Sequence, residues 1–156
     1  MPVDLAEHVL EVLKATSAVT NLVVNGAAGI VESSDVTAQA ITDAQTTRRE
    51  TGNPAKILAI GVHDAGEKAL DAQRSEQSVA IWLIDRERGY ANIRPAMKAV
   101  YAALQGKNTA LTSPFEGRTA IITIEMESRT GHLLDLAFDI NLEVMTFKAI
   151  INLDLG

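Results

Sequence analysis

The sequence predicts a small α+β domain, in which a mainly antiparallel sheet carries an N-terminal helix and a central helix on one face. Three observations predict this class: a helical pattern at residues 3–15, a second one at residues 90–104, and two strands of alternating polarity near the C-terminus. The chain has 156 residues, of which 47% are hydrophobic, so it can bury one core of ordinary size. We therefore expect a single domain that covers residues 1–156.

Composition and charge argue against several classes of protein. The chain contains no cysteine, which rules out disulfides, thiolate metal sites and thiol nucleophiles. Its formal net charge of -6 disfavours general binding of nucleic acid, because that binding depends on Lys and Arg. The first residues are acidic and no apolar stretch is long enough to span a bilayer. We expect a soluble protein that is made and kept in a cytoplasm, without a membrane segment.

The charge is distributed unevenly along the chain. Residues 79–119 contain six basic and three acidic side chains, whereas residues 120–156 contain two basic and six acidic ones. Blocks of opposite sign on one subunit favour contacts between unlike surfaces of neighbouring copies.

The N-terminal third combines a clear helix with a weak pattern. Leu5, Val9 and Leu13 recur at helical spacing, which predicts an amphipathic helix over residues 3–15, followed by a short turn. The next stretch is polar and ends in the breakers Gly52-Asn53-Pro54, with only a marginal helical face before them. We expect a projecting loop at about residues 31–54 that becomes ordered in contact with partners.

The central third predicts two strands and a helix. Residues 56–63 and 77–85 are short apolar runs typical of strands. In the second run the residues that point to one face and those that point to the other are both apolar, so protein or a partner must cover both faces of this strand. In the helix that follows, Asn92 is the expected N-cap and Pro95 lies in the first turn, where proline is tolerated.

The C-terminal part predicts an antiparallel pair of strands. Ile122 and Ile124 alternate with Glu125 and Glu127, and residues 136–144 alternate in the same way. The pattern predicts one core face and one acidic face. Residues 148–156 alternate only weakly, which leaves a further strand or a C-terminal arm as alternatives.

The sequence shows no pattern typical of a metal site or of catalysis. His8, His63 and His132 lie on separate elements without ligand spacing, so we expect no metal, no cofactor and no catalytic residue. Glu125 and Glu127 could form a pair of catalytic acids, but a solvated sheet face is the favoured interpretation. A small acid–base enzyme that uses Glu125, Glu127 or His132 is an alternative hypothesis.

Arginine and tryptophan provide the candidate interface residues. Trp82 is the only tryptophan, and Arg86 and Arg88 follow it closely. Tryptophan and arginine dominate binding hot spots, so these residues and the pair Arg48 and Arg49 are candidates for contacts between subunits. The alternatives are a core position for Trp82 and ordinary solvated charges for the arginines.

The order of these segments resembles the tail-completion or tail-terminator family of long-tailed bacteriophages. The resemblance depends on the N-terminal helix with the turn Val19-Thr20-Asn21-Leu22-Val23, on the strands Lys56–Ile60 and Val79–Asp85, on the Ala-rich helix that ends Tyr101–Leu104, and on the two alternating strands. Two departures are the polar insertion at residues 31–53 and the extra residues after Val144.

The resemblance implies a structural virion protein without enzymatic activity. Members of this family form a ring, here expected to be a hexamer, that stops polymerisation of the tail tube and joins the tail to the head connector. The expected partners are further copies of the chain, the tail-tube protein and the head connector, while DNA passes through without specific binding. Glu125 and Glu127 would face the channel and repel phosphates. The protein would be located in the virion, and in the host cytoplasm during assembly, and the alternative role is a head-completion adaptor or stopper.

Overall fold

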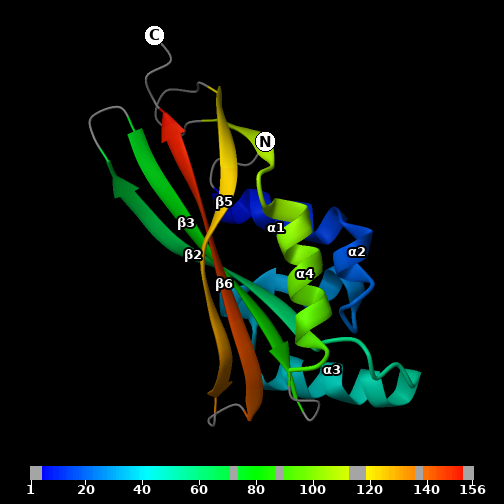
Figure 1. Cartoon of the computed structure of the whole chain (residues 1–156). Coiled ribbons are helices and arrows are strands. Elements are labelled where there is room, and N and C mark those ends of the chain that lie inside the picture. Colours follow the sequence, from blue (N-terminus) through cyan, green and yellow to red (C-terminus); the bar gives the residue numbers. More distant parts are fainter. Residues whose placement is uncertain (1–4, 71–73, 87–89, 113–118, 136–138, 153–156) are drawn as a thin grey trace.

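The computed structural model describes residues 5–70, 74–86, 90–112, 119–135 and 139–152. Six strands form one sheet in the order β1-β2-β3-β6-β5-β4 (Figure 1). β1 is parallel to β2 and the other neighbours are antiparallel, which confirms the predicted α+β class. The strands are β1 (Ile30–Glu32), β2 (Ala59–Ala69), β3 (Arg74–Asp85), β4 (Asn108–Thr112), β5 (Thr119–Asp135) and β6 (Ile140–Asn152).

Three helices cover one face of the sheet and form the main core with it (Figure 1). They are α1 (Leu5–Ala15), α2 (Ser17–Thr20) and α4 (Ile93–Leu104), and the single 3-10 turns η1 (Gly26–Gly29) and η2 (Ser33–Asp35) flank β1. The apolar stripe of α1 is buried as predicted, because it packs against alternate side chains of β2 and β3. The buried partners on β3 are Val79, Ile81 and Leu83.

The boundaries of α4 agree with the prediction, but its buried face differs. The helix begins directly after Asn92, and Pro95 lies in its first turn. The helical spacing of Tyr90, Ile93, Met97, Tyr101 and Leu104 predicts one apolar face, but Tyr101 is 42% exposed. The small side chain of Ala96 is fully buried instead, and a small side chain lets the helix approach the sheet closely. The buried stripe is Ile93, Ala96, Val100 and Leu104.

The expectation of a projecting loop at residues 31–54 is wrong, because most of this stretch forms the helix α3 (Ala38–Thr51). The Thr37 hydroxyl caps the helix by accepting a hydrogen bond from the Ala40 amide at 3.1 Å. Gly52 ends it with a φ of +65°, a conformation that glycine adopts without strain. The buried face combines two apolar and two polar residues, which is why the apolar pattern alone did not reveal it: Ile41, Ala44, Gln45 and Arg48.

α3 covers the second face of the sheet at one end, which we call the lower end because it lies at the bottom of Figure 1. Successive residues of a strand point to opposite faces, so Leu83 belongs to the main core and Ile84 to this second cluster. The prediction that residues 77–85 are covered on both faces is therefore confirmed only near the end of the run, at Ile84, while the face around Ser78 lies beyond α3. The buried residues of the second cluster are Ile41, Ala44, Leu58, Ile84 and Ile140.

β2 and β3 extend beyond their predicted ends and form a long hairpin at the other end of the sheet (Figure 1). Residues 64–69, which lie beyond the predicted strand 56–63, pair with residues 75–79 across a bulge at Gly66, whose φ is +101°. β6 likewise continues to Asn152, so residues 148–152 are strand and the alternative of an arm is wrong there. Residues 153–156 lie outside the described residues.

The predicted acidic face of the C-terminal strands is wrong at Glu143. This residue is 2% exposed and lies on the main-core face, since it opposes Leu83 of β3. The apolar residues of this alternation, expected on the main-core face, lie on the other one: Ile140 and Leu142 belong to the cluster under α3, and Val144 opposes Trp82. The reason is that β6 lies in the middle of the sheet and has cover on both faces. A simple division into a core face and a solvent face applies only to strands that are covered on one side.

Candidate functional site

Arg48, a predicted interface residue, lies inside the subunit and is 4% exposed. Its guanidinium forms an ion pair with the carboxylate of Asp85 at the end of β3. It also donates hydrogen bonds to the carbonyl oxygens of Lys56 at 2.9 Å and Arg86 at 2.6 Å. The expectation of a solvated loop charge at Arg48 is therefore wrong, because this side chain joins α3 to the sheet.

Asp85 is fully buried next to Arg48. Burial raises the pKa of this carboxyl above its ordinary value, although the hydrogen bonds from Arg48 and from the Arg86 amide act in the opposite direction. Its Oδ1 atom accepts both of these hydrogen bonds, and Oδ2 has no partner among the described residues. The pair is thus a buried ionic contact with one incompletely satisfied oxygen.

Arg86 extends this network toward the surface. Its Nε donates to the carbonyl oxygen of Asp139 at 3.0 Å, in the turn that precedes β6. Its Nη1 donates to Gln45 at 3.1 Å and to Thr42 at 3.3 Å, both on α3. Arg86 therefore connects three elements of its own subunit, and only part of its side chain is accessible to a partner.

Trp82 lies on the face of the sheet that α3 partly covers, and it is half-buried. Its ring stacks on that of His63, with centroids 5.4 Å apart and an angle of 24° between the planes. His63 in turn shares a hydrogen bond of 2.9 Å with the Ser33 hydroxyl. Trp82 thus lies at the margin of the second apolar cluster, and part of its ring is accessible to solvent.

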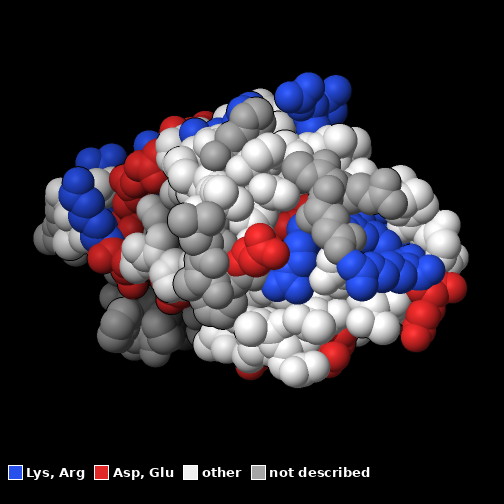
Figure 2. All heavy atoms as spheres, turned by 90° about the horizontal axis from the view of Figure 1, so that it is seen from below, with Lys and Arg blue, Asp and Glu red and all other residues white. Residues whose placement is uncertain are grey.

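Of the remaining predicted arginines, Arg49 lies at the lower end of the molecule. Arg49 is exposed in the last turn of α3, and Arg88 lies outside the described residues. Figure 2, which views the molecule from below, shows lysine and arginine side chains gathered at this end. Arg94 of α4 is exposed as well, and Lys56 is half-buried. Of the predicted interface arginines that the structure describes, Arg49 is exposed, whereas Arg48 and Arg86 contact other elements of the subunit.

Glu125 and Glu127 are both exposed on β5, but the sheet does not present them as a matched pair. Glu125 opposes Lys148 of β6, so a basic side chain lies in the adjacent position on the same face. Glu127 falls at a shift of register between Met126 and Ser128. The local charge is consequently mixed, in contrast to the uniformly acidic face that the alternating pattern predicted.

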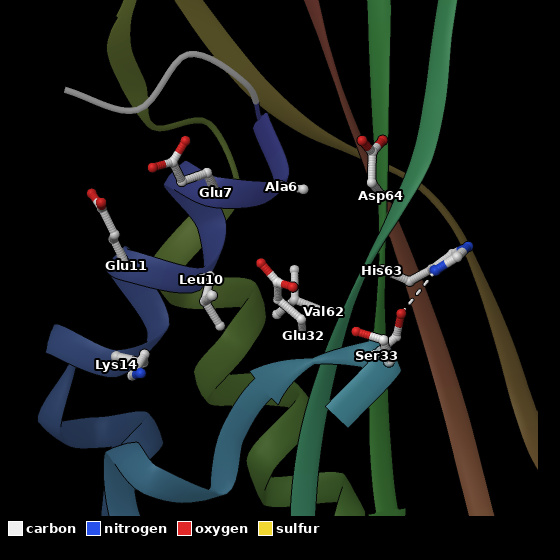
Figure 3. Close-up of a pocket in the computed structure, with 11 residues that line it drawn as sticks. Ala6, Glu7, Leu10, Glu11, Lys14, Glu32, Ser33, Val62, His63 and Asp64 are labelled. Atoms are coloured by element: carbon white, nitrogen blue, oxygen red, sulfur yellow. Dashed lines mark hydrogen bonds between the residues drawn. The ribbon is translucent and has the colours of Figure 1, made fainter. Parts of the chain in front are cut away.

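An open groove of about 570 Å³ lies between α1 and the edge of the sheet formed by β1 and β2 (Figure 3). Four carboxylates line it, with one lysine among them. Burial lowers the pKa of His8, which follows Glu7 on α1, and the charge of Glu11 partly offsets that effect. The charged lining residues are Glu7, Glu11, Lys14, Glu32 and Asp64.

A smaller pocket of about 220 Å³ lies near the opposite edge of the sheet, between α4 and β5. Its walls are apolar and two basic side chains accompany them. Arg129 is 46% exposed and forms an ion pair of 3.6 Å with the buried Glu143. The lining residues are Met97, Lys98, Tyr101, Met126, Arg129 and Met145.

Sequence reasoning missed both of these surfaces, since each is assembled from separate segments. The acidic groove combines residues of α1, of β1 with η2, and of β2. Glu7 and Glu11 are four residues apart on α1, so they share one side of that helix. That spacing was the only local signal. It could have indicated an acidic strip, but it could not have indicated which strand would face it.

The described residues include no cluster of three or more His, Asp or Glu side chains that could hold a metal ion. None of the helices within the described ranges is both long enough and apolar enough to cross a membrane.

Comparison with known proteins identifies a shared fold. No protein-family model matches the sequence, and no curated protein is significantly similar to it. Among solved structures, one chain from the "Virion of native gene transfer agent (GTA) particle" is similar, with a TM-score of 0.58 and 15% sequence identity. The alignment covers 95% of this chain and 94% of that chain. The protein therefore has, over almost its whole length, the fold of a chain found in that virion.

Proposed function

We propose that the protein is a structural component of a virion that forms a homo-oligomeric ring at the head-proximal end of a tail. In this role it ends polymerisation of the tail tube and joins the tail to the head connector. The observation that carries the proposal is the fold shared with a chain of a gene transfer agent virion, over 95% of this chain and 94% of that one. The resemblance of the sequence to phage tail-terminator proteins supports the same role.

The uncovered part of the sheet suits the wall of a channel. Beyond α3, the face that carries Trp82 presents polar and mixed side chains, among them Ser78, Thr146 and Glu125 beside Lys148. In the proposed ring this face and Glu127 line the channel. Opposite charges next to each other bind phosphate weakly, so DNA slides past without being held.

The proposal is tested by the assembly state and position of the protein. The purified protein, alone and mixed with the tail-tube protein of the same virus, is measured by light scattering and imaged by negative stain. We expect rings, and capped tubes of limited length in the mixture. A protein that stays monomeric in both conditions, with tubes that continue to grow, contradicts the proposal.

Separation of virion parts distinguishes the tail role from the alternative of a head-completion adaptor or stopper. Tails and filled heads are purified from mutants that block joining, and each fraction is probed with an antibody against the protein. We expect the protein at one end of isolated tails. Its recovery with heads alone contradicts the terminator role and favours the adaptor.

The same ring assay tests the enzymatic alternative. A protein with Glu125, Glu127 and His132 all replaced by alanine should still form rings, because the proposed role needs no catalytic group at these positions. Loss of a small-molecule turnover in that variant, with assembly intact, would favour an enzyme.

A further inference from the structure

The two edges of the sheet carry opposite charge on the side of the main core. The acidic edge consists of exposed carboxylates on β1 and β2, beside the acidic groove along α1. The basic edge lies across the sheet and consists of exposed side chains of α4, of the turn after α4 and of β5, of which Lys98 and Arg129 line the second pocket. We define the acidic edge as Glu32, Asp64 and Glu67, and the basic edge as Lys98, Lys107 and Arg129.

The register of the strands aligns the charges of the two edges across the sheet. Glu32 of β1 opposes Val62, which opposes Ile81 on β3. Ile81 opposes Met145 on β6, and Met145 opposes Arg129 on β5. One continuous row of paired residues therefore starts at an exposed glutamate and ends at a half-exposed arginine, with all its side chains on one face.

A second row repeats this arrangement nearer the top of Figure 1. Glu67 of β2 opposes Gln77, which opposes Ala149 of β6, and Ala149 opposes Ile124 of β5. The Ile124 amide donates a hydrogen bond of 3.0 Å to the carbonyl oxygen of Lys107, so Lys107 ends the row. Glu67 and Lys107 are both exposed. Two independent rows thus join an acid at one edge to a base at the other.

The backbone at these edges is also available for pairing. Within the described part of the chain, β1 covers β2 only at Ile60–Val62, and no strand pairs with the outer side of β2 from His63 to Ala69. β4 covers β5 only at Thr119–Thr123, and the stretch from Glu127 to Leu134 has no outer strand there. Uncovered edges of this length are typical of surfaces that pair with another chain.

The outlines of the two edges fit each other. β1 lies outside β2 only at the lower end of the acidic edge. The row of paired residues that begins at Glu32 of β1 ends at Arg129, so β1 is level with the stretch of β5 that no outer strand covers. β2 and β5 run in opposite directions, since three antiparallel pairings separate them. A neighbour placed beside the sheet in the same orientation would therefore continue its antiparallel order.

We propose that the acidic edge of one copy binds the basic edge of the next copy, head to tail, with Glu32 against Arg129 and Glu67 against Lys107. This inference rests on the proposed function, and it states which surfaces close the ring. Four strand spacings of about 4.8 Å separate the two ends of the first row. The pairs therefore cannot form within one subunit. A heterologous contact of this kind uses both edges of every copy, so it is the type that closes rings.

Engineered cysteines test the contact, and a chain without native cysteine gives no background. Glu32→Cys and Arg129→Cys are combined in one chain, and the purified protein is oxidised. We expect a ladder of covalent oligomers that ends at the size of the ring. The matched control combines Glu50→Cys and Arg94→Cys, two exposed positions outside both edges, and should remain almost entirely uncrosslinked.

Charge reversal provides a second readout that does not depend on the Arg129 ion pair. Glu67→Lys or Lys107→Glu alone should reduce the oligomeric fraction at a fixed concentration about tenfold, and the two together should restore it. Circular dichroism checks that each variant is folded. Rings that form equally well in all variants and give no ladder would overturn the proposed edges while leaving the proposed function intact. Absence of any oligomer in the unmodified protein, with or without tail-tube protein, would overturn both.

Discussion

At the scale of single residues, one buried ion pair determines how α3 is attached. The guanidinium of Arg48 forms an ion pair with Asp85 and donates hydrogen bonds to two backbone carbonyls. Neither the Arg48 nor the Asp85 side chain is more than 4% exposed. A buried ion pair contributes little net stability when it is intact, because desolvation of both charges offsets their attraction. Removing one partner destabilises the protein strongly, since the other charge is then left buried without a counter-ion.

The first prediction concerns this pair. Arg48→Met should lower the free energy of unfolding by about 3–5 kcal/mol at neutral pH, because Asp85 loses its counter-ion. Urea unfolding followed by the fluorescence of the single tryptophan, Trp82, measures the change. Arg49→Met, on the exposed side of the same helical turn, is the matched control and should change stability by no more than about 0.5 kcal/mol. Equal midpoints for both variants would contradict a structural role of the pair.

His8 gives a prediction about pH. Burial lowers the pKa of this imidazole below 6.5, so the folded protein binds fewer protons than the unfolded chain between the two pKa values. The contribution of His8 to stability is therefore complete above about pH 6.5 and is lost as the pH falls through the folded-state pKa. Urea midpoints of the wild type should decline between pH 7.5 and 5 more steeply than those of His8→Gln. Parallel pH dependences would contradict this assignment.

At the scale of elements, α3 shows why some helices are not predicted from their sequence. Its buried face includes only two apolar residues, Ile41 and Ala44, and continues with Gln45 and Arg48. The pattern of apolar residues is the main signal for helices, and a face completed by polar side chains does not display it. The structure places the N-cap of this helix at Thr37 and its C-cap at Gly52.

The cap of α3 gives the third prediction. Thr37→Ala should lower the free energy of unfolding by about 1 kcal/mol, since the Ala40 amide loses its hydrogen-bond acceptor. Chemical denaturation at pH 7 measures it. Thr46→Ala, in the exposed middle of the same helix, is the control and should be neutral or slightly stabilising, because alanine has the higher helix propensity. A loss of stability in the control that equals the loss in Thr37→Ala would show that the cap contributes nothing specific.

At the scale of the whole molecule, the distribution of charge has a different form from the one that the sequence predicts. Residues 79–119 form a basic block and residues 120–156 an acidic one, but folding places acids of α1, β1 and β2 at one edge. The basic edge includes Arg129, which belongs to the acidic block of the sequence. Opposite edges of the sheet, and not two successive segments of the chain, therefore carry the complementary charges.

The fourth prediction follows from this arrangement. If charged edges hold neighbouring copies together, raising the salt concentration from about 0.1 M to 1 M should dissociate the oligomer, since screening shortens the range of the attraction from about 10 Å to 3 Å. Sedimentation velocity at a fixed protein concentration measures the distribution of species. An oligomer that persists or grows at high salt would indicate an apolar interface instead.

The sequence by itself determined the α+β class, the helix α1, the position of α4 and the core of each central strand. These features depend on the period of apolar residues along one segment, and the sequence displays that period directly. Tertiary structure decided the rest: the helix at residues 38–51, the burial of Arg48 and Glu143, and the alignment of Glu32 with Arg129. Each of these depends on which segments become neighbours across the sheet. Strand order and register establish those contacts, and no local pattern encodes them.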